Sequence, residues 1–166
     1  NAGVSAFSPF EERTEEELDF VIGVNLKGPI LMTQAIFNRY FKSQKAGCVV
    51  NIASIYGVVA GDMNIYKEGD RRTPEIYGAT KAAVISLTQY FAAYMATYNV
   101  RVNSISPGGI FNHQDSEFVQ KYSQKVPMNR MGKEQELLST LEYLISEEST
   151  YVTGQNVVVD GGLTTW

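Results

Sequence analysis

The sequence has very little cysteine and histidine, the residues that build disulfides and many metal sites. Cys48 is the single cysteine and lies in an apolar run, and His113 is the single histidine, in a polar loop. One cysteine excludes a disulfide framework and a cysteine-based metal site. A histidine-based metal site or triad would depend on His113 alone. We therefore expect no metal, and the cysteine usage suits a reducing, cytoplasmic environment.

The chain also lacks an excess of positive charge and a long uninterrupted apolar run. Lys and Arg number 14 against 18 Asp and Glu, which gives a net charge of −4. With no basic stripe, a nucleic acid is not an expected partner. No apolar run reaches the ~20 residues that a membrane span needs, so no membrane is expected either. The first residue is Asn1 and no signal peptide is visible, so we expect a processed chain or a piece of a longer protein.

What the sequence does contain is a regular alternation of helical and buried-strand patterns. Thr14 and Glu17 form a capping box that opens a helical pattern, which Gly28 and Pro29 are expected to break and Gly47 to end. The remaining expected elements are strands at 48–54, 100–109 and 155–162 and helices at about 75–98 and 133–149. This order predicts one α/β domain over 1–166, a parallel sheet with helices on both faces.

In a parallel sheet of this kind, chemistry is expected at the carboxyl ends of the strands. The residues that follow the three expected strands are 54–57, 107–110 and 160–162. The helix at 75–98 adds Tyr77 and Lys81, which lie four residues apart and so share one helix face. A tyrosine that acts as acid and base near neutral pH must lose about 3 pKa units, roughly 4 kcal/mol. A nearby ammonium favours the phenolate, although the pair alone does not distinguish an enzyme from a packed helix.

The surrounding motifs decide between these readings. The segments "NAG", "VNLKG", "NIASIYG", "YGATK", "RVNSISPGG" and "TGQNVVVDGG" occur in the order typical of the short-chain dehydrogenase/reductase family, and they cover essentially the whole chain. The chain therefore resembles that family. The resemblance implies a Rossmann-like, doubly wound sheet and an enzyme that interconverts an alcohol and a carbonyl on a small molecule, with NAD or NADP as hydride carrier.

The resemblance also implies a role for each matching residue. Tyr77 would be the general acid/base, and Lys81 would lower the pKa of Tyr77 and bind the nicotinamide ribose. Ser54 would orient the substrate oxygen, and Asn25, at a helix break, would hold a water behind Lys81. The residues implied to lie along the cofactor are Asn1, Ala2, Gly3, Tyr77, Lys81, Pro107, Gly108 and Ile110.

Two departures from the family pattern affect the expected function. Members begin with a strand and a Gly-rich turn that binds pyrophosphate, and about three βα units of this kind, on the order of 80–90 residues, do not precede "NAG" here. We expect the functional protein to be longer, and these 166 residues to bind dinucleotide poorly and to leave one strand edge unpaired.

The second departure is an insertion between Ser54 and Tyr77, which the family usually spaces more closely. The extra residues fall at 61–75 and are expected over the substrate mouth. Their charges suggest a polar, phosphorylated or sugar-like substrate, while a solvated loop is the alternative: Asp62, Lys67, Glu68, Asp70, Arg71, Arg72. The insertion resembles the flagellin-modification branch, whose members act in making nonulosonic acids such as legionaminic acid.

Other features bear on assembly and on competing functions. The helix at 75–98 carries a Met/aromatic stripe of Tyr90, Phe91, Tyr94, Met95 and Tyr98, which indicates core packing or a subunit interface. In the family this helix and the one at 30–43 commonly pack in oligomers, so a homodimer or homotetramer is implied. Two other functions stay open: a binding or scaffold protein that keeps the fold without turnover, and a sugar-nucleotide epimerase or dehydratase that shares the Tyr-x-x-x-Lys pair.

Overall fold

The computed structural model describes residues 3–67 and 72–166, and its centre is a parallel three-stranded sheet. Strands β1 (Gly47–Ile52), β2 (Val100–Pro107) and β3 (Asn156–Val159) lie in the order β1-β2-β3. Gly47 pairs with Val100 and Ser104 with Asn156 in this register. The α/β fold with a parallel sheet is confirmed. Within the described ranges β1 pairs with β2 only, so its other edge carries no strand.

The first long helix is continuous, so the expected break at Gly28 and Pro29 is wrong. Helices α1 (Glu15–Ile22), α2 (Gly28–Ile36) and α3 (Lys42–Gln44) are joined by π-helical segments at Gly23–Lys27 and Phe37–Phe41. The first widened turn precedes Pro29, which stands at the start of α2, where its missing N–H is least disruptive. The capping box is present: the Glu17 N–H donates to Thr14 Oγ1 at 3.3 Å, and the Thr14 N–H to Glu17 Oε2 at 3.1 Å.

The end of this helix also differs from the expectation. Lys45, with φ of 49°, takes the left-handed position at the helix terminus, and Gly47 is already the first residue of β1. Position 47 requires a glycine for a different reason: a Cβ there would lie 2.6 Å from the Phe41 ring. By length and composition alone the helix over Glu15–Gln44 could cross a membrane. That observation is weak, because a core helix of a soluble protein passes the same test, and Phe37 of this helix is packed in the core.

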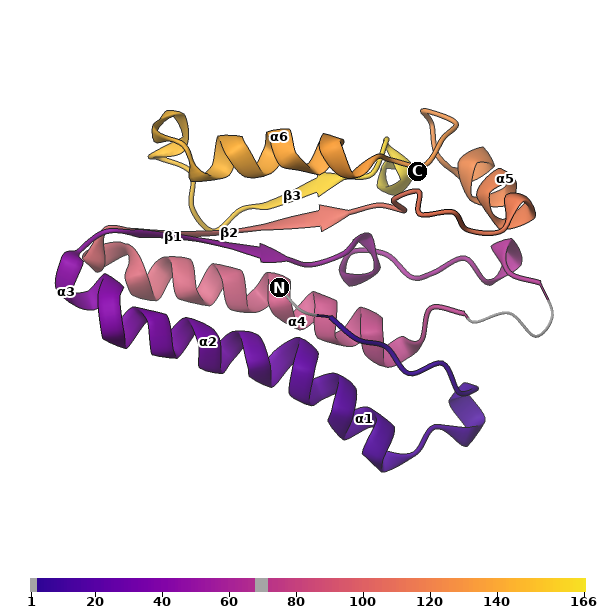
Figure 1. Cartoon of the computed structure of the whole chain (residues 1–166), viewed down its shortest axis with the longest axis horizontal. Coiled ribbons are helices and arrows are strands. Elements are labelled where there is room, and N and C mark those ends of the chain that lie inside the picture. Colours follow the sequence, from indigo (N-terminus) through magenta and orange to yellow (C-terminus); the bar gives the residue numbers. More distant parts are fainter. Residues whose placement is uncertain (1–2, 68–71) are drawn as a thin grey trace.

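The other helices cover the two faces of the sheet (Figure 1). Helix α4 (Glu75–Met95) and the long helix lie on one face, where Phe37, Ala92, Met95, Val100 and Val102 form a buried cluster. Helix α6 (Glu134–Ile145) lies on the opposite face. There the Leu144 carbonyl accepts hydrogen bonds from Arg101 Nη1 at 2.7 Å and from the Cys48 thiol at 3.4 Å. The predicted layering, with helices on both faces, is therefore present.

Sequence patterns missed helix α5 (Ser116–Lys125), which follows β2. Asp115 caps it, because its carboxylate accepts hydrogen bonds from the N–H groups of Glu117 and Phe118. Single-turn helices occur at Phe10–Glu12, Ile55–Gly57, Met63–Ile65, Ala96–Tyr98, Glu147–Ser149 and Leu163–Thr165. In Figure 1 the carboxyl ends of all three strands point to the end of the molecule where α4 begins and α5 lies. The expected site is therefore at that end.

Candidate active site

The predicted catalytic side chains Ser54, Tyr77 and Lys81 meet at the carboxyl end of β1. Ser54 is buried two residues beyond β1, and Tyr77, the third residue of α4, is half-buried. The Ser54 hydroxyl hydrogen-bonds to the Tyr77 phenol. The Lys81 amine lies 5.5 Å from the centroid of the Tyr77 ring and donates to the Ile52 carbonyl at 2.8 Å. A phenol, a hydroxyl and an ammonium thus share one small, partly dry region.

The close approach of two backbone segments makes this meeting possible. The turn that follows Ser54 crosses α4 at Gly57 and Gly78. A Cβ on Gly57 would lie 2.7 Å from the Lys81 carbonyl carbon, and a Cβ on Gly78 would lie 2.9 Å from the Tyr56 carbonyl oxygen. Neither distance leaves room for a side chain, so the two glycines allow the Ser54 turn to rest directly on the helix that carries Tyr77.

Burial dominates the acid–base properties of the pair, contrary to the expectation that Lys81 would lower the pKa of Tyr77. Burial raises the pKa of the Tyr77 phenol, and the hydrogen bond from Ser54 opposes that rise. Burial also lowers the pKa of the Lys81 amine, whose residue is 7% exposed. The amine donates to the Ile52 carbonyl and also lies near the phenol ring.

Asn25 lies in the π-helical segment and uses its whole side chain to hold the start of the described chain. The Val4 N–H donates to Asn25 Oδ1 at 2.8 Å, and Asn25 Nδ2 donates to the Val4 carbonyl at 2.9 Å and to Thr80 Oγ1 at 3.3 Å. Asn25 is only 2% exposed. This clamp places Gly3 over the site, since a Cβ on Gly3 would lie 3.7 Å from Lys81 Nζ. Asn1 and Ala2 lie outside the described residues.

The turn after β2 is held in place by α5 and by the end of β3. The Gly108 N–H donates to the Val159 carbonyl at 2.9 Å, and the Gly109 N–H donates to the Tyr122 hydroxyl at 2.5 Å. Ile110 forms a short parallel bridge with Gly132. The turn over Pro107–Ile110 therefore has a fixed shape at the same end of the sheet as Tyr77.

Comparisons with known proteins agree with this geometry. A family model described as enoyl-(acyl carrier protein) reductase matches residues 1–164. The 3-oxoacyl-[acyl-carrier-protein] reductase of Thermotoga maritima is 35% identical over 169 residues, covering 98% of this chain and 63% of the relative. This chain belongs to the short-chain dehydrogenase/reductase family.

Other members of the family extend the comparison. The post-translational flagellin modification protein A of Campylobacter coli is 33% identical over 153 residues, covering 92% of this chain and 59% of the relative. A short-chain dehydrogenase of Leptospira borgpetersenii, solved with bound NAD+, is 48% identical with a TM-score of 0.92, covering 98% of this chain and 62% of that one. A gluconate 5-dehydrogenase of Burkholderia cenocepacia was solved with NADP and tartrate. It is 30% identical with a TM-score of 0.88, covering 100% and 63% of the two chains.

The chain spans about three fifths of the length of the family members it matches.

A cavity of about 370 Å³ lies beside the turn that follows Ser54. The lining residues include Ile55, Tyr56, Tyr122, Lys125, Leu163 and Trp166. Tyr56 lines this space and also interacts with Tyr66 of the insertion, and burial raises the pKa of the Tyr56 phenol well above its usual value. Tyr56 therefore contacts the insertion and also forms part of the cavity wall.

The insertion at 61–75 is attached to α5, where its charges Asp62 and Lys67 are paired, while Arg72 is exposed. Lys125 Nζ lies 2.9 Å from Asp62 Oδ2. Lys67 Nζ lies 3.2 Å from Asp115 Oδ1 and 3.0 Å from Glu117 Oε2. The predicted charges at Glu68, Asp70 and Arg71 lie outside the described residues. Because the described pairs are satisfied internally, they give no support to a phosphate-binding role.

Two further structural roles were missed by sequence reasoning. Tyr122, 3% exposed, holds the turn after β2 through its hydroxyl, and Arg13 forms the buried contacts described below. Neither belongs to a motif, so no local signal marks them. His113 lies beside the Phe111 ring at 5.4 Å in a left-handed backbone position. Among the described residues, no group of three or more His, Cys, Asp or Glu side chains could hold a metal ion.

Proposed function

We propose that this chain is the catalytic part of an NAD(P)-dependent oxidoreductase that interconverts an alcohol and a carbonyl on a polar small molecule. The observation that carries the proposal is the convergence of Ser54, Tyr77 and Lys81 at the carboxyl end of β1. A hydrogen-bonded phenol beside an ammonium can exchange a proton with a substrate oxygen. A scaffold protein without turnover would not need a buried amine, because burying an ammonium that has no carboxylate partner among the described residues lowers stability.

The residues present fit a nicotinamide coenzyme. Gly3 is exposed, and a Cβ on it would lie 3.7 Å from Lys81 Nζ and 3.9 Å from Asn25 Oδ1, so the glycine leaves open the space over the amine. When bound there, the coenzyme would supply or accept the hydride. The residues proposed to hold it are Asn1, Ala2, Gly3, Tyr77, Lys81, Pro107, Gly108 and Ile110. The coenzymes named for solved relatives, NAD+ and NADP, support this assignment.

The proposed proton transfer uses Tyr77 and Ser54. Because burial raises the pKa of the Tyr77 phenol, the hydroxyl is protonated at neutral pH and can give its proton to a carbonyl oxygen. The Ser54 hydroxyl would hydrogen-bond to that same oxygen. In the oxidative direction the phenolate would accept the alcohol proton, and the Lys81 charge would stabilise it. The side-chain amide of Asn25 already forms three hydrogen bonds, so it has no group left for the proposed water. We assign that water to the main-chain carbonyl of Asn25. In an α-helix this carbonyl would accept from the N–H four residues later, but that residue is Pro29, which has no N–H.

For the substrate, we propose a hydroxyl-rich, sugar-derived molecule. The cavity beside the Ser54 turn, about 370 Å³, is lined by aliphatic and aromatic residues together with Asp62 and Lys125. Those two charges are paired with each other, which favours an uncharged polyol over a phosphorylated substrate.

The proposal is tested by Tyr77→Phe in the full-length protein, with Tyr90→Phe as control. Tyr90 is 62% exposed on the same helix, and Tyr90→Phe keeps the aromatic ring and removes only a hydroxyl. Turnover is followed by coenzyme absorbance with NAD and with NADP, over a panel of sugar alcohols, hydroxy acids and hydroxyacyl thioesters. We expect Tyr77→Phe to lose nearly all turnover and to keep its circular dichroism and melting temperature, while Tyr90→Phe stays active. Full activity of Tyr77→Phe would reject the proposal.

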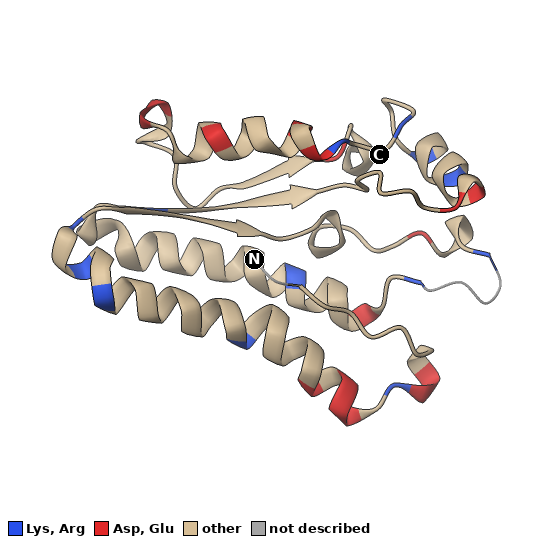
Figure 2. Ribbon diagram, in the orientation of Figure 1, with Lys and Arg blue, Asp and Glu red and all other residues tan. Residues whose placement is uncertain are grey.

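We also propose that two copies associate through the outer face of α2 and α4. Figure 2 shows few charges along the bodies of these helices. The exposed apolar residues there include Leu31, Met32, Tyr90 and Tyr94, with exposures of 51% to 66%. Such a patch on one face is typical of an interface. Light scattering of the full-length protein is expected to give a dimer or tetramer, and Met32→Glu is expected to weaken it; a monomer at micromolar concentration would contradict this.

A further inference from the structure

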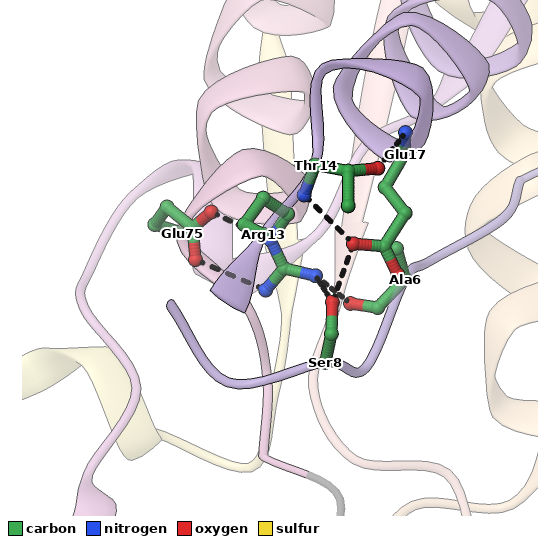
Figure 3. Close-up of polar contacts among 6 residues, drawn as sticks. All are labelled: Ala6, Ser8, Arg13, Thr14, Glu17 and Glu75. Carbon is green, nitrogen blue, oxygen red and sulfur yellow. Dashed lines mark hydrogen bonds and ion pairs between the residues drawn. The ribbon is translucent and has the colours of Figure 1, made fainter. Parts of the chain in front are cut away.

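Arg13 is a nearly buried arginine that joins three separate segments of the chain, and no motif marks it (Figure 3). Its side chain is 5% exposed. Arg13 Nε and Nη2 donate to the two carboxylate oxygens of Glu75 at 3.0 and 3.3 Å. Arg13 Nη1 donates to the Ala6 carbonyl at 2.8 Å and to Ser8 Oγ at 3.0 Å. The Glu75 side chain is 43% exposed, but the bidentate geometry still fixes the carboxylate relative to the buried guanidinium.

Glu75 is the first residue of α4, two residues before Tyr77. Helix α4 begins after Pro74, which has no side chain to cap the free N–H groups of the first turn. The Glu75 carboxylate takes over part of this role. Arg13 lowers the pKa of that carboxyl, and the N–H groups of Glu75 and Ile76 add to the shift. The helix dipole also stabilises a carboxylate at the N-terminus of a helix. The turn that carries Tyr77 therefore depends on a side chain that Arg13 holds.

The other contacts of Arg13 reach the segment that leads to Gly3. Ala6 lies two residues after Val4, which Asn25 holds by two hydrogen bonds. The Ser8 hydroxyl extends this hydrogen-bond network to α1. It donates to Glu17 Oε2 at 2.6 Å, and Glu17 is part of the capping box of α1. One arginine thus ties the beginning of α1, the segment beside Gly3 and the first turn of α4 together.

We propose that Arg13 and Glu75 are positioning residues, which hold the first turn of α4 so that the Tyr77 hydroxyl stays at its place beside Ser54. This inference rests on the proposed function, since it assigns a purpose to the position of Tyr77. Neither residue touches Ser54, Tyr77 or Lys81 in the hydrogen bonds above. Their effect passes through the backbone of 75–77. A small displacement of a reacting group is enough to slow catalysis by on the order of 100-fold.

The experiment compares Glu75→Gln, Arg13→Met and the double variant in the full-length protein, with Glu134→Gln as matched control. Glu134 is likewise the first residue of a helix, α6, but it lies on the opposite face of the sheet and is exposed. Turnover is measured with the substrate that the panel above identifies, together with coenzyme affinity and melting temperature. Hydrogen exchange of the amides at 78–81 reports the first turn of α4 without any need for activity.

We expect Glu75→Gln and Arg13→Met to lower kcat by about 10- to 100-fold. Coenzyme affinity should change less than about threefold in Glu75→Gln and should fall further in Arg13→Met, which also releases the segment that leads to Gly3. The double variant should lose no more than the worse single one, because the two act as a unit. Exchange at 78–81 should quicken about tenfold or more in both singles and stay unchanged in Glu134→Gln. Glu75→Asp, which keeps the charge, should recover part of kcat.

Two outcomes overturn the inference. One is a Glu75→Gln protein with the kcat and the exchange rates of the Glu134→Gln control. The other is a protein whose melting temperature falls while kcat, measured well below that temperature, and exchange at 78–81 stay as in the parent. Tyr77→Phe in the same series separates a failure of this inference from a failure of the proposed function. If Tyr77→Phe keeps its turnover, the proposed function fails. The exchange rates at 78–81 then still decide whether Arg13 and Glu75 hold the first turn of α4.

Discussion

Asn25 offers the sharpest test of how the site is held together. Replacing it with alanine removes three hydrogen bonds, two partly buried ones to the Val4 backbone and a buried one to Thr80. Each is worth about 1 kcal/mol net, so Asn25→Ala is expected to lower the free energy of unfolding by about 3 kcal/mol. Val4 is half-buried, so water can reach part of its backbone after the substitution. The expected loss is therefore smaller than it would be if the Val4 N–H and carbonyl were fully buried without a hydrogen-bond partner.

The assay is urea unfolding of the full-length protein, with coenzyme affinity measured in parallel. Asn25→Asp keeps the acceptor for the Val4 N–H and loses the two bonds that Asn25 Nδ2 donates, and it adds a buried charge. Its unfolding free energy is expected to fall at least as far as that of Asn25→Ala. Because Gly3 is positioned through Val4, coenzyme binding should weaken in both variants.

Asn64→Ala is the control for these two variants. Asn64 is exposed and bonds only within its own turn to Asp62 in the hydrogen bonds described, so less than about 0.5 kcal/mol should be lost. If Asn25→Ala is no less stable than Asn64→Ala, the reasoning from these hydrogen bonds is wrong.

Three more predictions concern the surroundings of the site. Tyr122→Phe leaves the Gly109 N–H without its acceptor, so we expect a loss of about 1–2 kcal/mol in unfolding free energy and a higher KM for the coenzyme, measured by unfolding and steady-state kinetics. Arg130 lowers the pKa of Glu136 to about 2, below its usual 4.5. The pair therefore stabilises the fold above pH 4.5 and loses this effect as the pH falls toward 2, so the stability difference between the parent and Glu136→Gln should close over that range; a constant gap would contradict it. Lys125→Met breaks the largely exposed ion pair with Asp62 of the insertion. It should change the unfolding free energy, measured by urea unfolding, by less than about 1 kcal/mol. A larger loss would contradict the argument from exposure.

The acid–base argument has a direct consequence for rates. Burial raises the pKa of the Tyr77 phenol, so the proton donor is available at neutral pH and the phenolate is scarce. Reduction of a carbonyl should therefore proceed at neutral pH, while oxidation of an alcohol should speed up as the pH rises toward the Tyr77 pKa. Rates of both directions between pH 6 and pH 10 check this. An oxidation rate that is flat over the range would show that bound coenzyme or substrate reverses the effect of burial.

The sequence by itself determined the class of fold and predicted the residues of the candidate site. The strands 48–54, 100–109 and 155–162 were expected from apolar, β-branched runs. The structure has β2 and β3 within those ranges, while β1 begins one residue earlier, at Gly47, and ends at Ile52. Spacing alone put Tyr77 and Lys81 on one helix face, and motif order added Ser54. These features are local, because hydrogen-bond periodicity and helix spacing are set within a few residues.

Only the tertiary structure decided the remaining features. It joined the long helix through Pro29 by a π-helical turn, formed α5 under the insertion, and paired Arg13 with Glu75 across 62 residues of sequence. It also set the direction of the Tyr77 pKa shift, because burial and the aim of the Lys81 amine depend on how α4 packs against β1. Contacts between distant segments and the removal of water arise only when the chain is packed, so local patterns do not contain them.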